Sequence, residues 1–148
     1  MLRGGFMNDC VICKLVDEEI DVTKIYEDDF VVAVMDIQPI NPGHLFISPK
    51  KHFEFVSQLD DELGAHIFKV AMKLGSALRN CGLRCDGVNY FIADGKAAMQ
   101  EVPHVHLHVI PRIDGDGFGF KFDKSYFIKP KREELVEIGK MIQAALNK

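Results

Sequence analysis

The spacing of apolar residues along the chain predicts five short strands and two helices. Apolar runs bounded by turn residues predict strands over residues 24–27, 30–36, 44–48, 87–93 and 104–110, with Pro49 and Pro111 closing the third and the fifth. Apolar residues at three- and four-residue steps predict a long helix that opens at Asp60–Asp61 and runs to about Asn80, and another over Lys131–Asn147. Strands in succession, interrupted by one long helix and followed by another, favour an α+β fold with a mostly antiparallel five-stranded sheet.

Length and composition are typical of one globular domain spanning residues 1–148, with residues 1–8 as a flexible lead-in. Hydrophobic residues make up 47% of the chain and charged residues 27%, which argues against disorder. The net charge of −4 and the lack of a basic stripe argue against charge-driven binding to nucleic acid. The sequence contains no signal peptide pattern and no apolar run of the roughly 20 residues that span a bilayer. We therefore expect no membrane association and a cytoplasmic location.

Three histidines stand at alternate positions in the last predicted strand. Because side chains alternate along a strand, His104, His106 and His108 are predicted to project from one face, while the residues between them face the core. Mutual repulsion favours uncharged rings near pH 7, and a neutral imidazole acts as a nucleophile, a base or a metal ligand. The middle ring is flanked on both sides, which suits it to attack while its neighbours orient it. A solvated strand face and a structural zinc site are the alternative interpretations.

Two cysteines near the N-terminus form a second candidate site. Cys10 and Cys13 are separated by two residues, a spacing typical of zinc sites, although structural zinc requires two more ligands. A redox pair and two inert thiols are the alternatives. Cys81 and Cys85 follow the long helix without histidines near them in the sequence, so we interpret them as ordinary thiols.

Residues 104–110 resemble the signature of the histidine triad (HIT) family of nucleotide hydrolases and transferases. Residues 41–50 and 114–118 resemble two further segments of that family, and the resemblance is closest to the small bacterial HIT hydrolases. It implies a HIT-like fold and a reaction in which His106 attacks the α-phosphorus and forms a covalent nucleotidyl-histidine, which water releases as a nucleoside monophosphate. It also implies that His108 contacts the phosphate and the leaving atom, and that His44 supports the active-site rings.

The resemblance assigns binding residues as well. It implies that Asp36 accepts hydrogen bonds from the ribose hydroxyls, that Glu101 lies near the leaving group, and that the base pocket contains Val11, Ile12, Leu15, Val34 and Ile37. It makes His104 a ligand and not a catalyst, because it implies a structural zinc ion bound by Cys10, Cys13, His52 and His104. Family members commonly form dimers, and we therefore expect a homodimer.

Three positions near the triad depart from the family pattern. Met99 replaces a small residue, Ala93 stands where relatives often carry an amide, and Glu101 stands where some carry a serine or threonine. We expect a nucleotide hydrolase that acts on purine nucleoside phosphoramidates, with diadenosine polyphosphate hydrolysis as the close alternative. The first two departures support a second hypothesis, a zinc-stabilised nucleotide-binding module with little turnover. A nucleotidyl transferase whose acceptor is not water is the third.

Overall fold

A computed structural model describes residues 9–146 and divides the chain after Asp116 into two compact units. The first unit contains a five-stranded sheet in the order β1 (Lys24–Glu27), β2 (Val31–Met35), β3 (Leu45–Pro49), β5 (Leu107–Arg112) and β4 (Gly87–Ile92). Every neighbouring pair of these strands is antiparallel, which confirms the predicted α+β class and sheet. The predicted lead-in at residues 1–8 and the last residue of the predicted C-terminal helix lie outside the described residues.

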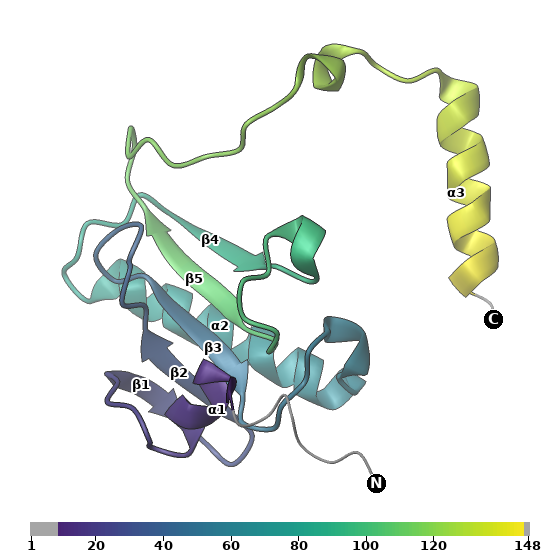
Figure 1. Cartoon of the computed structure of the whole chain (residues 1–148). Helices are drawn as coiled ribbons and strands as arrows, with labels where there is room; N and C mark the ends of the chain where they lie inside the picture. The colour runs from purple at the N-terminus through teal and green to yellow at the C-terminus, as the bar shows by residue number, and fades with distance from the viewer. Residues whose placement is uncertain (1–8, 147–148) are drawn as a thin grey trace, which may run out of the picture. The chain divides into compact units, whose positions relative to one another are not determined.

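The long helix α2 (Asp61–Asn80) covers one face of the sheet (Figure 1). It begins as predicted because the Asp60 carboxylate accepts a hydrogen bond from the Leu63 N–H at 2.8 Å. Gly82, with a φ of +89°, follows its end in the left-handed conformation that commonly stops a helix. The apolar stripe of α2 packs on alternate strand residues to form the main core, which includes Ile67, Val70, Leu74, Leu78, Val31, Ala33, Leu45, Ile47, Leu107 and Val109.

A short helix, α1 (Val11–Val16), lies on the opposite face of the sheet (Figure 1). Its Leu15 packs against Val32 and Val34, the residues of β2 that alternate with those facing α2. The hydrophobic pattern does not predict this helix, because it is shorter than two turns and Cys10 at its N-cap makes no side-chain capping hydrogen bond. The helical turn brings the two N-terminal cysteines onto one side.

The last strand begins at Leu107, three residues later than predicted. β3 and β5 pair only through residues 45–47 and 107–109. Before that point the Val105 carbonyl accepts a hydrogen bond from the Ser48 hydroxyl at 2.8 Å, and the Val105 N–H donates to the Phe53 carbonyl at 2.7 Å. Neither group is left for the sheet, so the first two histidines of the triad lie on the segment that enters the strand.

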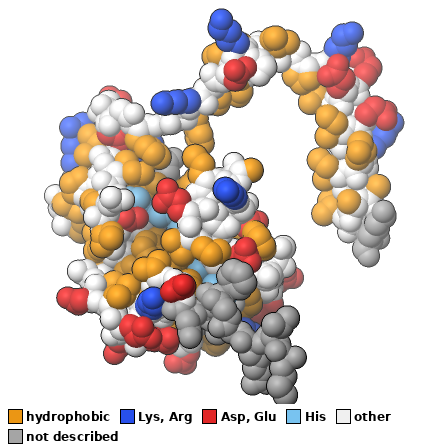
Figure 2. Space-filling view, viewed as in Figure 1, with side chains coloured by type: hydrophobic (Ala, Val, Ile, Leu, Met, Phe, Trp, Pro, Cys, Tyr) orange, Lys and Arg blue, Asp and Glu red, His pale blue; other side chains and the backbone are white. Residues whose placement is uncertain are grey.

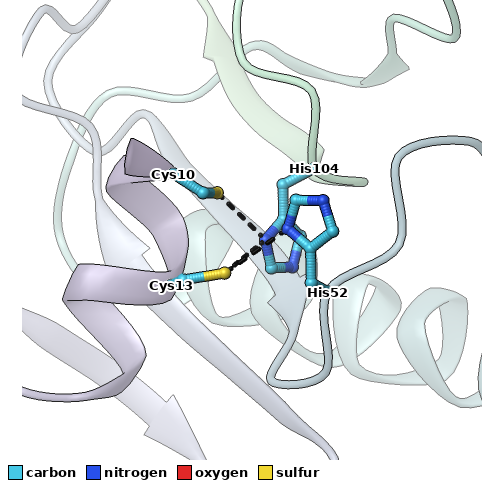
Figure 3. Close-up of side chains that lie close together, drawn as sticks. All are labelled: Cys10, Cys13, His52 and His104. Atoms are coloured by element: carbon cyan, nitrogen blue, oxygen red, sulfur yellow. Dashed lines mark hydrogen bonds between the residues drawn. The ribbon is translucent and has the colours of Figure 1, made fainter. Parts of the chain in front are cut away.

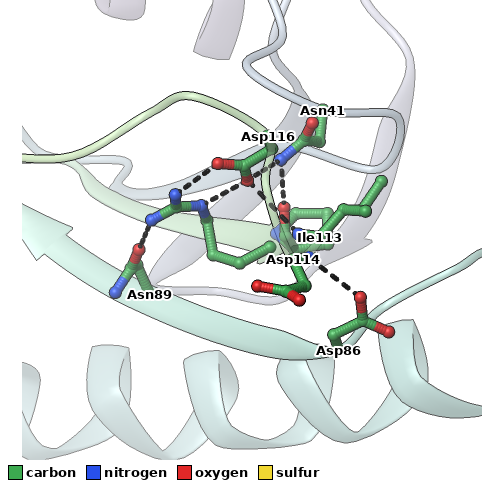
Figure 4. Close-up of polar contacts among 8 residues, drawn as sticks. Asn41, Asp86, Asn89, Ile113, Asp114 and Asp116 are labelled. Carbon is green, nitrogen blue, oxygen red and sulfur yellow. Dashed lines mark hydrogen bonds and ion pairs between the residues drawn. The ribbon is translucent and has the colours of Figure 1, made fainter.

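Polar contacts from Asn41, which precedes β3, and from Asp116, which follows β5, hold the last residues of β5 in place (Figure 4). The strand continues through Pro111, where the sequence predicts its end, because the Pro111 carbonyl accepts a hydrogen bond from the Asn41 side chain at 2.9 Å. Asn41 also donates to the Asp116 carboxylate at 2.7 Å, and Arg112 donates to the same carboxylate at 2.7 and 2.5 Å. These contacts tie the turn that precedes His44 to the strand that carries the last triad histidine.

The second unit, which starts at Gly117, contains the 3₁₀ helix η4 (Lys124–Phe127) and the α-helix α3 (Arg132–Leu146). α3 confirms the predicted C-terminal helix, and none of its residues is buried. Two short 3₁₀ helices, η2 (Val56–Gln58) and η3 (Lys96–Ala98), lie in connections of the first unit. Within residues 9–146, no helix combines the length and apolar character needed to cross a membrane. The single domain over residues 1–148 stays a prediction.

Candidate functional site

A cavity of about 370 Å³ is lined by α1, the end of β2 and the triad segment. Its polar lining consists of Asp36, Glu101, His106 and His108. Its apolar lining includes every residue predicted for the base pocket, namely Val11, Ile12, Leu15, Val34 and Ile37. Figure 2 shows histidine atoms between hydrophobic side chains on this face of the molecule. A concave, mostly apolar site with a few converging polar groups is typical of small-molecule sites.

The His106 ring is fixed by the backbone. Its Nδ1 lies 2.7 Å from the His104 carbonyl oxygen, and because a carbonyl only accepts, this nitrogen carries the hydrogen. The uncharged ring therefore has its lone pair on Nε2. Phe46 and His108 contact the ring edge-on, with centroids 5.7 and 4.9 Å away. The cavity wall thus contains an imidazole with one defined nucleophilic atom.

A chain of hydrogen bonds likewise determines which nitrogen carries the hydrogen in the His44 and His108 rings. The Ile40 N–H donates to His44 Nδ1 at 3.1 Å, so the hydrogen of the neutral His44 ring lies on Nε2. This nitrogen donates to His108 Nδ1 at 2.9 Å, which places the hydrogen of His108 on Nε2. The Asp36 carboxylate lies 3.5 Å from His44 Nε2 and 3.6 Å from His108 Nδ1. His108 therefore presents a hydrogen-bond donor, whereas His106 presents an acceptor.

Burial keeps these two supporting rings uncharged at neutral pH. It lowers the pKa of His108 from the ordinary 6.5 to about 4, with the neighbouring His106 and His44 adding to the effect. It also lowers the pKa of His44, although the Asp36 carboxylate acts in the opposite direction. Mutual repulsion, which the sequence predicts as the cause of the neutral rings, lowers the pKa of His108 less than burial does.

Four metal-ligating side chains converge at a second place (Figure 3). Cys10 Sγ lies 3.4 Å from His104 Nδ1, and Cys13 Sγ lies 3.6 Å from that atom and 3.4 Å from His52 Nδ1. In a tetrahedral zinc site with Zn–S near 2.3 Å and Zn–N near 2.1 Å, neighbouring ligand atoms are roughly 3.3–3.8 Å apart. Two thiols and two imidazoles, all within 4.8 Å of one another, therefore fit zinc in kind and in spacing.

His104 is oriented toward this cluster. It is fully buried, and its Nε2 donates to the Pro49 carbonyl at 2.9 Å, which leaves the Nδ1 lone pair directed at the thiols. Its ring contacts His52 at a centroid distance of 4.8 Å, whereas the ring contacts of His106 are with Phe46 and His108. Burial and the neighbouring Cys10 raise the pKa of the Cys13 thiol to about 11, so thiolates here require a positively charged partner.

Comparison with known proteins places this geometry in a family. Residues 17–115 match the model of the HIT domain. The chain belongs to the HIT family. An uncharacterised HIT-like protein of Borreliella burgdorferi is 43% identical over 116 residues, which cover 78% of this chain and 84% of the relative. The crystal structure of a HIT family protein from Bacillus subtilis has a TM-score of 0.82 and 35% identity, covering 92% of this chain and 96% of that chain. The resemblance to the HIT family, noted first at residues 104–110, is thereby confirmed.

Other HIT relatives have names that state what they bind or act on. A zinc-bound histidine triad protein from Mycobacterium smegmatis is 36% identical, with a TM-score of 0.72 and coverage of 95% of this chain and 97% of that chain. An adenosine 5′-monophosphoramidase of Saccharomyces cerevisiae is 36% identical over 105 residues, 71% of this chain and 63% of the relative. An adenylylsulfatase of Arabidopsis thaliana is 34% identical over 110 residues, 74% of this chain and 55% of the relative. The HIT family thus includes nucleotide hydrolases.

The structure brings together the residues that the HIT resemblance assigns to each site. His44 precedes β3 by one residue instead of lying in it, yet its ring meets His108 as expected. Ile37 borders the cavity with 92% of its surface exposed, so it lies at the rim. Sequence reasoning missed Phe46 and Phe91, which line the cavity. The signal for Phe46 is its spacing, because it follows His44 by two positions and therefore shares its face.

Proposed function

We propose that this HIT protein hydrolyses purine nucleoside phosphoramidates at the α-phosphorus through a covalent nucleotidyl group on His106. The tautomer of His106 carries the proposal: Nδ1 is bound to a carbonyl 2.7 Å away, so the lone pair lies on Nε2 of a ring that lines the ligand-sized cavity. The yeast relative named as a monophosphoramidase supports a phosphorus–nitrogen bond as the bond that is cleaved.

The first step transfers the nucleotidyl group to the protein. The His106 Nε2 lone pair attacks phosphorus and forms a P–N bond as the bond to the leaving amine breaks. The leaving nitrogen keeps the bonding electron pair and takes a proton from solvent. The His106 ring becomes positively charged, which strengthens the hydrogen bond from its Nδ1 to the His104 carbonyl. His108 Nε2–H donates to a phosphoryl oxygen and stabilises the charge there.

The second step returns the protein to its starting state. Water attacks phosphorus, the bond to His106 breaks, and the bonding electron pair returns to Nε2 as a proton passes to solvent. The product is a nucleoside monophosphate. In this arrangement the Asp36 carboxylate accepts hydrogen bonds from the ribose hydroxyls. The apolar lining contributed by α1 and β2 encloses the base.

We also propose that the four-residue cluster holds a structural zinc ion. The ligand spacing and the zinc-bound relative from Mycobacterium smegmatis support this assignment. The ion would be bound by Cys10, Cys13, His52 and His104, and it would supply rigidity and no chemistry to the phosphate. Its effect on the reaction runs through the backbone, because the carbonyl of His104 is the group that orients His106.

The covalent route is tested by mass spectrometry of protein quenched during turnover of adenosine 5′-phosphoramidate. We expect an AMP adduct on His106, and no adduct and no turnover in His106→Asn, which still binds AMP. His66→Asn is the matched control, because His66 lies on α2 against Asp28 at 2.7 Å and does not line the cavity. Equal turnover in His106→Asn would refute the route. Nucleotide binding without turnover in the unaltered protein would favour the binding-module hypothesis.

We propose a homodimer formed through α2 and the edge strand β4. Phe68 and Met72 of α2 and Tyr90 and Ile92 of β4 are between 37% and 50% exposed, and the rings of Phe68 and Tyr90 lie 5.8 Å apart. An exposed strand edge beside apolar side chains is suited to pairing across a two-fold axis. Light scattering should give twice the chain mass of 16.7 kDa. A mass of one chain at micromolar concentration would contradict the proposal.

A further inference from the structure

A second cavity of about 710 Å³ adjoins the cavity that contains His106. Met99 and Glu101 line both cavities and therefore form the boundary between them. The remaining charged residues of the second cavity are Glu54 and Lys96, whose opposite charges offset each other. Glu101 is left as the uncompensated charge at the boundary. Among the described residues, no hydrogen bond or ion pair engages its side chain.

The charged groups in the cavity that contains His106 are also negative. Its described lining includes the carboxylates of Asp36 and Glu101 and no lysine or arginine. Sites that bind several phosphates normally place cationic side chains around them, because each phosphate brings at least one negative charge. In this cavity a polyphosphate leaving group would therefore meet a carboxylate and no lysine or arginine, and in the second cavity the charge of Lys96 is offset by that of Glu54. A leaving group that carries a positive charge would meet a carboxylate of opposite sign.

The path of the leaving group follows from the direction of attack. In phosphoryl transfer the attacking and leaving atoms lie roughly in line with phosphorus. The nucleoside occupies the apolar side of the cavity contributed by α1 and β2, so the leaving group has to extend along the remaining lining, which includes Ala93, Met99 and Glu101. Beyond that boundary lies the second cavity. Phe55 and Pro103 supply apolar surface there.

The loop that carries the boundary residues is held in one conformation. The Gln100 side chain accepts from the Gly95 N–H and donates to the Glu54 carbonyl, each at 2.8 Å. Met99 has a φ of +68°, a conformation rare for residues other than glycine, and its side chain is 70% exposed. The loop therefore fixes an apolar side chain and a carboxylate at the junction of the two cavities.

We propose that Glu101 selects the leaving group and that this protein prefers phosphoramidates of aliphatic amines that carry a second positive charge. The inference rests on the proposed function and adds the class of leaving group to it. Met99 contacts the aliphatic part of the amine, and the Glu101 carboxylate attracts the ammonium group at its end. Anionic leaving groups, including polyphosphates, are repelled by the same carboxylate.

The expected selectivity follows from Coulomb's law. Two unit charges about 7 Å apart in water attract or repel each other weakly. A positive leaving group gains this energy and a negative one loses it, so the two differ by twice the energy, which gives roughly a tenfold difference in rate between the two substrates. The difference depends on salt, because charges exposed to solvent are screened over about 3 Å at 1 M ionic strength and about 30 Å at 0.01 M. A packing effect of Glu101 would not depend on salt in this way.

The experiment compares three adenosine 5′-phosphoramidates whose leaving amines are putrescine, butylamine and γ-aminobutyrate. These amines have similar lengths and end in a positive, a neutral and a negative group. We expect kcat/KM to be about tenfold higher for putrescine than for γ-aminobutyrate at low salt, and the ratio to approach one at 1 M salt. Glu101→Gln should bring the low-salt ratio close to one, Glu101→Lys should invert it, and Glu101→Asp should preserve it. Glu62→Gln, which removes a carboxylate outside both cavities, should leave it unchanged.

The outcomes separate this inference from the proposed function. Hydrolysis of all three substrates that requires His106, with a ratio that Glu101→Gln and Glu101→Lys do not alter, overturns selection by Glu101 and leaves the hydrolase assignment intact. Hydrolysis of none of the three by the unaltered protein overturns both. Each variant serves as its own reference, because only the ratio between substrates is compared, so a variant that folds in lower yield still gives a decisive result.

Discussion

Replacing His44 tests the hydrogen-bond chain that fixes the donor on His108. In His44→Asn the shorter amide cannot reach His108 Nδ1, which lies 2.9 Å from His44 Nε2 in the native protein. In His44→Gln the amide nitrogen stands close to the position of Nε2 and can still donate. The two substitutions therefore form a matched pair that differs mainly in reach.

The expected magnitude follows from one buried hydrogen bond between neutral groups. Such a bond contributes about 1 kcal/mol, and its loss frees His108 to place its hydrogen on either nitrogen. The fall in kcat/KM for His44→Asn should be about fivefold from this effect and up to about 30-fold where ring orientation is lost as well. In His44→Asn the side-chain oxygen stands close to the position of Nδ1 and can still accept from the Ile40 N–H. In His44→Gln that N–H loses its acceptor, which should lower the free energy of unfolding by about 1–3 kcal/mol. His44→Gln should stay within about threefold of the native rate.

The assay combines steady-state kinetics with ¹⁵N NMR of the histidine rings. The NMR spectrum reports which nitrogen of His108 carries the hydrogen, a property that a change in stability alone does not alter. We expect hydrogen on Nε2 in the native protein and in His44→Gln, and a mixture in His44→Asn. Hydrogen on Nδ1 of His108 in the native protein, or equal rates for the two variants, would refute the reasoning.

Two further predictions concern the metal cluster and pH. Native protein should contain one zinc ion per chain. Chelation or Cys10→Ser should lower Tm by roughly 10 °C, whereas Cys81→Ser, which alters an exposed thiol, should leave Tm unchanged. An unchanged Tm after complete metal removal would exclude a structural role. Because the folded-state pKa of His108 is lowered from 6.5 to about 4, its contribution to stability is present above pH 6.5 and is lost as the pH falls toward 4. Urea unfolding should show a loss of about 2–3 kcal/mol in this range that His108→Gln reduces, and an identical slope in both proteins would contradict the assignment.

The elements that the sequence predicts well are those whose signals are local. α2 begins and ends where its Asp60 cap and Gly82 place it, and the alternation at residues 105, 107 and 109 correctly identifies the residues that face the core. α1 escapes prediction because packing on β2, and not capping or length, stabilises it. The start of β5 escapes it because the side chain of Ser48, 57 residues away in the sequence, takes the Val105 carbonyl.

For the candidate sites too, the sequence predicts some features and not others. Their membership was predictable, because the histidine spacing and the cysteine pair match a known family and the fold brings the assigned residues together. The nitrogen that carries the hydrogen in each ring was not predictable, because it depends on contacts across the sheet. The hydrogen on His108 is set by His44 and the Ile40 N–H, and neither contact can be read from the spacing of the triad. The second cavity beside Met99 likewise depends on how the loop at residues 95–101 folds back on Glu54.

His104 contributes its side chain to the cysteine–histidine cluster and its carbonyl to the hydrogen bond with His106. One residue therefore serves two purposes, and a mutation that shifts it disturbs both together. A descendant of this protein that lost its cysteines would need another anchor for His104 before it could keep the His106 ring in the same tautomer. The two sites are expected to change in concert over evolutionary time, although only one of them is proposed to bind the nucleotide.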